Sequence, residues 1–153
     1  MGDRRLVLLL VVGLLARLLG IFFNGMVDLY EILLEWGFAV VREGLVDAFG
    51  INYGIFSYAL FGAGAWAADL FPRFWWAPYK LIILAFDIGV FVALLKIVPT
   101  RKLAIVALYW LNPWFILHQA YHGFWEAPHI LFGLLAVLAV RQGRREEWKW
   151  ATV

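Results

Sequence analysis

Three histidines and a glutamate lie close together in the last third of the chain. They are, in order, His118, His122, Glu126 and His129. On one unbroken helix they would fall within an arc of about 80°, since each residue turns the helix by about 100°. Such a face could bind a metal. Gly123 and Pro128 interrupt the run, however. We therefore predict no metal, and interpret the segment as a loop whose polar side chains face a water-filled cleft.

Two carboxylates follow the first long apolar run. Asp28 comes five residues after that run, and Glu31 lies on the same face of a predicted helix. A carboxylate in this position is suited to act as a general base or to bind a cation. The alternative is that both side chains form the hydrated side of a helix that lies on a membrane surface.

Polar residues also interrupt the apolar runs themselves. A carboxylate inside a membrane costs about 2.5–3.5 kcal/mol on insertion scales, so Asp87 is either functional or paired, for example with Arg17. Asn112 precedes Pro113 within another apolar run, where the proline frees a backbone carbonyl one turn earlier. We predict structural roles for Asp87 and Asn112.

Two cations flank the start of the second long apolar run. Arg73 and Lys80 are placed where the phosphate of a lipid would lie. They are predicted to bind such a phosphate, and the alternative is ordinary anchoring at the membrane surface.

The composition indicates the environment in which these residues act. The 153 residues are 65% hydrophobic and 16% charged, whereas soluble domains are about 45–50% apolar and about 25% charged. We predict an all-α integral membrane protein with one domain, residues 1–153. This excludes a disordered chain, a secreted disulfide scaffold and a cytosolic enzyme. The net charge is only +2, and the basic residues occur in short clusters between apolar runs, so the sequence does not predict binding to nucleic acid.

Four apolar runs have about the 20 residues that a transmembrane helix needs. They are residues 6–23, 79–98, 103–121 and 124–140. The first run lacks the small-residue cleavage site of a signal peptide, so we predict a retained anchor. Residues 24–78 form an outer segment, with one helix within Asp28–Glu43 and one within Gly54–Phe71, both lying in the outer interface.

The distribution of basic residues sets the predicted orientation. If Gly54–Phe71 does not cross the membrane, most basic residues share one side. These are Arg4, Arg5, Lys96, Arg101, Lys102, Arg141, Arg144, Arg145 and Lys149. Because cytoplasmic loops are enriched in Lys and Arg, we predict that both termini are cytoplasmic. The candidate site residues then face the outside of the plasma membrane or the lumen of the endoplasmic reticulum.

Several short motifs occur in a characteristic order. They are Asp28-Leu29-Tyr30, Arg42-Glu43-Gly44, residues 51–58, Lys80 ahead of Phe86-Asp87, Leu111-Asn112-Pro113-Trp114 and His122-Gly123-Phe124-Trp125-Glu126. The ordered set resembles the N-terminal module of the GT-C glycosyltransferases. These membrane enzymes use polyprenyl-phosphate sugars, and the dolichyl-phosphate-mannose mannosyltransferases are examples.

The resemblance implies a reaction and roles for individual residues. Asp28 would be the catalytic base that deprotonates an acceptor hydroxyl, which then attacks the anomeric carbon while the lipid phosphate leaves. The sugar would occupy a cleft whose lining residues are Tyr30, Glu31, His118, His122 and Glu126. The donor would be a polyprenyl-phosphate-linked sugar, and no separate cofactor is predicted.

The sequence also departs from that family. GT-C members usually have eight or more spans, and this sequence resembles a module truncated after four, without the later helices that complete the donor groove. Tyr53-Gly54 stands where members often carry a proline. We therefore expect contacts with membrane lipids and a homo- or hetero-oligomer. The alternatives are a non-catalytic membrane subunit that binds lipid and packs helices, and a membrane metalloprotein built on the histidines.

Overall fold

The computed structural model describes residues 2–24, 31–48, 54–68 and 70–142 of the chain. Two predicted site residues, Asp28 and Tyr30, lie outside the described residues, as does the side chain of Glu31. Every regular element in the described ranges is a helix, and no strand occurs in them. The predicted all-α class is therefore confirmed for this part of the chain.

The described helices follow the stretches in which the sequence predicts them. They are α1 (Gly2–Ile21), η1 (Glu31–Gly37), α3 (Phe38–Glu43), α4 (Ile55–Ala68), η2 (Pro72–Phe74), α5 (Ala77–Ile97), η3 (Pro99–Arg101), α6 (Lys102–Ile105), η4 (Val106–Trp110), α7 (Pro113–Phe115), η5 (Ile116–Tyr121) and α8 (Glu126–Arg141). The run 103–121, predicted as one span, is broken at Leu111 and Asn112 into two helical halves.

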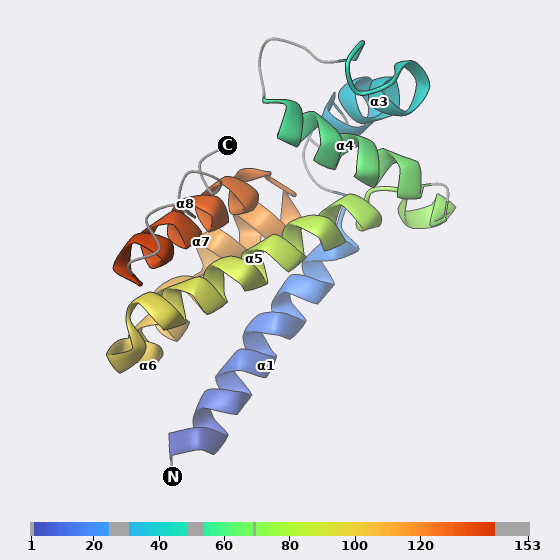
Figure 1. Ribbon diagram of the computed structural model, residues 1–153. Coiled ribbons are helices and arrows are strands. Elements are labelled where there is room, and N and C mark those ends of the chain that lie inside the picture. Colours follow the sequence, from blue (N-terminus) through green and yellow to red (C-terminus); the bar gives the residue numbers. More distant parts are fainter. Residues whose placement is uncertain (1, 25–30, 49–53, 69, 143–153) are drawn as a thin grey trace.

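The long helix α5 is the centre of the structure. It packs against α8 along much of its length, against α4 near its start, and against α1 and η5 on another side. η1 and α3 lie against α4 and form a separate layer beyond the start of α5 (Figure 1). Side chains from η1, α4 and the first half of α5 share one apolar cluster, in which Phe61, Tyr79 and Ile83 are fully buried.

No described helix is by itself both long and apolar enough to cross a membrane. Two pairs of consecutive helices, each bent at a short break, are together long and apolar enough for a membrane span. They are Ala77–Ile97 with Pro99–Trp110, bent by 109°, and Pro113–Tyr121 with Glu126–Arg141, bent by 119°. The four spans, and the membrane location itself, stay predictions.

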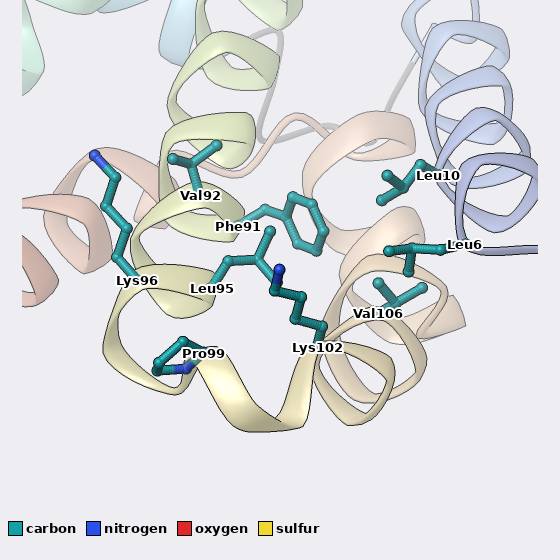
Figure 2. A pocket seen from close by; sticks show the side chains of 9 residues that line it. All are labelled: Leu6, Leu10, Phe91, Val92, Leu95, Lys96, Pro99, Lys102 and Val106. Atoms are coloured by element: carbon teal, nitrogen blue, oxygen red, sulfur yellow. The ribbon is translucent and has the colours of Figure 1, made fainter. Parts of the chain in front are cut away.

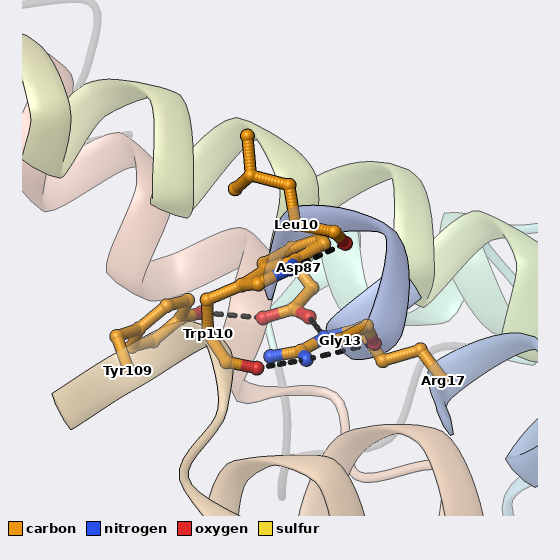
Figure 3. A network of polar contacts seen from close by, with 6 residues as sticks. All are labelled: Leu10, Gly13, Arg17, Asp87, Tyr109 and Trp110. Carbon is orange, nitrogen blue, oxygen red and sulfur yellow. Dashed lines mark hydrogen bonds and ion pairs between the residues drawn. The ribbon is translucent and has the colours of Figure 1, made fainter. Parts of the chain in front are cut away.

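A buried ion pair at the middle of α5 joins this helix to α1, and a tyrosine on η4 binds the same carboxylate (Figure 3). The Nε–H of Arg17 on α1 donates to Oδ2 of Asp87 on α5 at 2.5 Å, and the hydroxyl of Tyr109 on η4 donates to Oδ1 at 2.5 Å. The Nη1 of Arg17 donates to the carbonyls of Trp110 and Gly13, at 2.5 Å and 3.3 Å. Both oxygens of the Asp87 carboxylate thus have donors.

Glycines let α1 approach the second half of the chain closely. A Cβ atom at Gly13 would lie 2.3 Å from Nε1 of Trp110, and one at Gly20 would lie 2.7 Å from the ring of Tyr121. The Trp110 indole fills the space over Gly13, donates from Nε1 to the carbonyl of Leu10 at 2.9 Å, and covers the Arg17 guanidinium at 4.1 Å. Small residues seven apart therefore form the contact face of α1.

The break between η4 and α7 depends on Asn112. Its side-chain oxygen accepts from the backbone N–H of Trp114 at 2.9 Å, and its amide donates to the carbonyl of Leu108 at 3.1 Å. Asn112 is thus the N-cap of α7, and Pro113 occupies the first helical turn, where a missing N–H costs nothing. The side chain joins the end of one helix to the start of the next.

We predict that neither partner of the buried ion pair can be removed alone. Arg17→Met or Asp87→Leu should lower the free energy of unfolding by about 3–5 kcal/mol, because each leaves an unpaired buried charge. The double variant Arg17→Met/Asp87→Leu should lose less than either single variant, since no charge then remains buried. The measurement is chemical unfolding in detergent micelles.

The matched control is Arg101→Gln, which removes one exposed charge. It should change the free energy of unfolding by no more than about 0.5 kcal/mol. Single variants as stable as this control, or a double variant whose loss equals the sum of the two single losses, would contradict the role given to the pair.

Candidate functional site

A pocket of about 310 Å³ lies where η5 ends and the chain turns toward α8. Its lining residues are Trp114, Leu117, His118, His122 and Phe124. Two of the predicted cleft residues, His118 and His122, therefore border one pocket, and the rest of the lining is mostly aromatic. Pockets of this kind, largely apolar with a few placed polar groups, are typical of sites for small ligands.

His118 is held between two aromatic rings. Its imidazole stacks on Trp114, with ring centroids 5.6 Å apart and planes 14° apart, and on Phe124, at 4.1 Å and 20°. Its Nε2 atom lies 3.4 Å from Oε2 of Glu126 at the start of α8. The two rings fix the plane of the imidazole close to the carboxylate.

The backbone around His118 is wider than an α-helix. The N–H of His122 donates to the carbonyl of Leu117 at 2.9 Å, which is the five-residue spacing of a π-helical turn. Such turns are frequent at functional sites. Gly123 then adopts φ of +77°, a conformation that side chains with a Cβ disfavour. This turn brings Phe124 and Glu126 back to face His118.

The Glu126 carboxylate has one oxygen without a hydrogen-bond donor among the described residues. Its Oε2 atom is shielded from solvent, although the side chain as a whole is 42% exposed. A shielded carboxylate oxygen costs free energy unless a donor approaches it. The His118 Nε2 contact lacks hydrogen-bonding geometry, so Oε2 has no donor, while the exposed part of the carboxylate is open to a hydroxyl of a ligand or to water.

His129, the fourth residue of the spaced set, does not line this pocket. Its Nδ1 lies 3.3 Å from the carbonyl of Trp125, and its ring packs against the Trp125 indole at 4.8 Å. Within the described residues, no group of three or more His, Cys, Asp or Glu side chains could hold a metal ion. The geometry therefore gives no support to a metalloprotein built on the histidines.

Lys80 occupies a different position from the one expected of a phosphate ligand. The residue is 1% exposed, and its ammonium donates to the carbonyls of Phe23 at 2.6 Å, Tyr121 at 2.6 Å and Gly20 at 3.2 Å. An ammonium has three protons, and each has an acceptor here. Lys80 therefore joins the last turn of α1 to the end of η5, and we assign it a structural role instead.

The remaining cation of the predicted phosphate site stays accessible. Arg73 is exposed in η2, with its guanidinium 5.6 Å from the ring centroid of Phe74. The neighbouring Trp76 is buried, and its Nε1 donates to the carbonyl of Ile21 at 3.0 Å. Trp76 and Lys80 together satisfy the carbonyls at the end of α1, which leaves Arg73 as the exposed cation of the predicted pair.

Three aromatic residues at these sites were not identified from the sequence as site residues. Trp114 precedes His118 by four residues, the spacing at which side chains on a helix meet. Phe124 follows Gly123, and only the turn at that glycine brings it onto His118. The tyrosine that pairs with Asp87, Tyr109, is 22 residues away in the sequence, and no local pattern indicates this contact.

Comparisons of the chain with protein-family models, curated proteins and solved structures find no match.

We predict that Lys80→Met destabilises the protein in the absence of any ligand. Three carbonyls at two helix ends would lose their donor, and the free energy of unfolding should fall by at least about 2 kcal/mol. The control is Arg42→Met, which replaces an exposed cation on α3. If Lys80 serves only to bind phosphate, its removal should leave the unliganded protein as stable as the Arg42→Met control. That result would restore the phosphate-binding role of Lys80.

Proposed function

We propose that the chain is a membrane protein that transfers a sugar from a polyprenyl-phosphate donor to an acceptor hydroxyl, alone or as one part of an oligomeric enzyme. The observation that carries the proposal is the pocket at the end of η5. There the imidazole of His118 is stacked between the aromatic rings that line the pocket, and the Glu126 carboxylate lies next to it, 3.4 Å from Nε2. An aromatic wall suits the C–H face of a sugar ring, and the polar groups suit its hydroxyls.

The position of this pocket within the bundle supports the proposal. Lys80, near the start of α5, contacts the ends of α1 and η5, so these segments meet at one end of the bundle, which we call the pocket end. At the other end, which we call the basic end, Arg141 on α8 donates from Nη1 to the carbonyl of Ile97 at 2.5 Å. Cationic residues gather there, namely Arg4, Arg5, Lys96, Arg101, Lys102 and Arg141. If the basic end is cytoplasmic, the pocket opens on the extracytoplasmic side.

The chemistry follows from the charges involved. A hydroxyl is a weak nucleophile and needs a base, for which the GT-C resemblance points to Asp28. In the proposed complex Glu126 accepts a hydrogen bond from a sugar hydroxyl, and His118 positions that hydroxyl. Arg73 is the exposed cation available to the leaving phosphate.

One observation favours the alternative, a non-catalytic membrane subunit. The buried charges of Arg17, Asp87 and Lys80 are all bound to other parts of the chain. Large apolar side chains are also exposed, including Trp66 at 70% and Trp114 at 67%. Exposed apolar surface of this extent indicates contact with lipid or with another subunit.

The membrane orientation can be tested with single cysteines, because the chain contains none. In intact cells a membrane-impermeant maleimide should label Asn52→Cys but neither Thr100→Cys nor Gln142→Cys. All three should react after permeabilisation, since Thr100 and Gln142 belong to the basic end. Labelling of Asn52 and Gln142 from the same side would contradict the orientation, and recovery of the protein outside the membrane fraction would contradict the membrane location.

Transfer itself can be measured in membranes that contain the full chain. The probe is polyprenyl-phosphate mannose labelled in the sugar, and the readout is label recovered in acceptor molecules. We expect Asp28→Asn to reduce transfer by at least about 100-fold, the usual contribution of a general base. Glu126→Gln should reduce transfer through a raised KM.

His129→Asn is the control, because His129 is exposed and packs on Trp125 outside the pocket. It should transfer at the wild-type rate, and equal thermal midpoints should show that all variants fold. Undiminished transfer by Asp28→Asn would disprove the assigned base. If membranes containing wild-type chain transfer no sugar, the non-catalytic alternative is favoured.

A further inference from the structure

An apolar groove follows the interface of α1 and α5 at the basic end. Its first part has a volume of about 430 Å³, and side chains from α1, α5, η3, α6 and η4 line it, including Leu6, Leu10, Phe91 and Val106 (Figure 2). A second cavity of about 300 Å³ continues it, because Leu10, Phe91 and Val92 line both. The two cavities are therefore adjacent along α1, and we call them together the groove.

Charge is confined to one end of this groove. Lys96, at the end of α5, and Lys102, at the start of α6, border the first cavity, with Pro99 in the turn between them. Both lysines are exposed. In Figure 2 the Lys102 side chain extends toward Leu95, whereas the Lys96 side chain points away from Lys102 on the other side of α5. The second cavity is lined by apolar and aromatic side chains alone.

The groove is long enough for part of a lipid chain. Along α5 it extends from Lys96 to Ile88, and along α1 from Leu6 to Leu14. Eight residues of helix span about 12 Å. Trp110 borders the far end, where its Nε1 already donates to the carbonyl of Leu10. A ligand that enters beside Lys102 therefore meets only apolar and aromatic side chains beyond it.

We infer that this groove binds an anionic glycerophospholipid. The lipid phosphate lies beside Lys102, and one acyl chain follows α1 toward Trp110. The inference rests on the membrane location given under the proposed function, but not on sugar transfer, since the groove and the pocket are at opposite ends of the bundle. Charge complementarity decides the class of occupant: the Lys102 ammonium beside the groove, with Lys96 also bordering it, favours a net-negative head group over a zwitterionic one. A helix of a second copy would instead bury the Lys102 ammonium.

The test is native mass spectrometry of the full chain released from micelles that contain phosphatidylglycerol or phosphatidylcholine with the same acyl chains. We expect wild type to retain phosphatidylglycerol at lower lipid concentration than phosphatidylcholine. Lys102→Gln should weaken phosphatidylglycerol retention about fivefold and leave phosphatidylcholine unchanged, as expected for one basic residue near an anionic lipid. Arg42→Gln removes one exposed cation at α3 and should leave the preference intact.

A second pair of variants tests the groove itself. Val92→Trp should fill it and abolish retention of phosphatidylglycerol, whereas Val137→Trp, at a similarly exposed valine on α8, should not. Equal retention of the two lipids by wild type, or no effect of Lys102→Gln, would overturn the inference. Conversion of a dimer to a monomer by Val92→Trp would also overturn it and identify a second copy as the occupant. Because Lys102 is remote from the pocket, Lys102→Gln should leave sugar transfer unchanged, which separates a failure here from a failure of the proposed function.

Discussion

The contact between Arg17 and Asp87 determines how α1, α5 and η4 fit together. A guanidinium and a carboxylate removed from solvent are tolerated only where their remaining hydrogen-bonding groups find partners. Tyr109 and the carbonyl of Trp110, both on η4, and the carbonyl of Gly13 on α1 supply most of those partners. Only Nη2 of the guanidinium has no partner among the described residues. The pair therefore requires all three segments to be in register, and a shift of one residue along α1 would separate the charges.

The alignment of α1 with α5 that the ion pair requires also determines the arrangement at the pocket end. Asp87 and Lys80 are seven residues apart on α5 and share a face, as do Gly13, Arg17 and Gly20 on α1. When Arg17 meets Asp87, the end of α1 is brought to the Lys80 ammonium. That ammonium also binds the carbonyl of Tyr121, so it sets where η5 ends. The turn at Gly123 and the stack on His118 begin immediately after this point.

The sequence predicted the helices better than it predicted their contacts. Long apolar runs and the Asn112-Pro113 pair indicate where helices lie and where one breaks, because hydrophobic content and backbone chemistry are local properties. The grouping of His118 with His122 could also be predicted, since the two are four residues apart. The role of Lys80 could not, because its three acceptors come from residues 41 to 60 positions away. The stacking of His118 likewise depends on a positive φ at Gly123, which changes the direction of the chain.

The use of polar groups differs between the middle of the bundle and its two ends. In the middle, Arg17, Asp87 and Tyr109 bind one another and hold three segments together. A charged group with such partners loses free energy if it turns to a ligand, so chemistry is not expected there. At the pocket end Glu126 keeps a shielded oxygen without a donor among the described residues, and at the basic end Lys96 and Lys102 stay exposed. Binding is therefore expected at the ends, and the buried network fixes the distance between them.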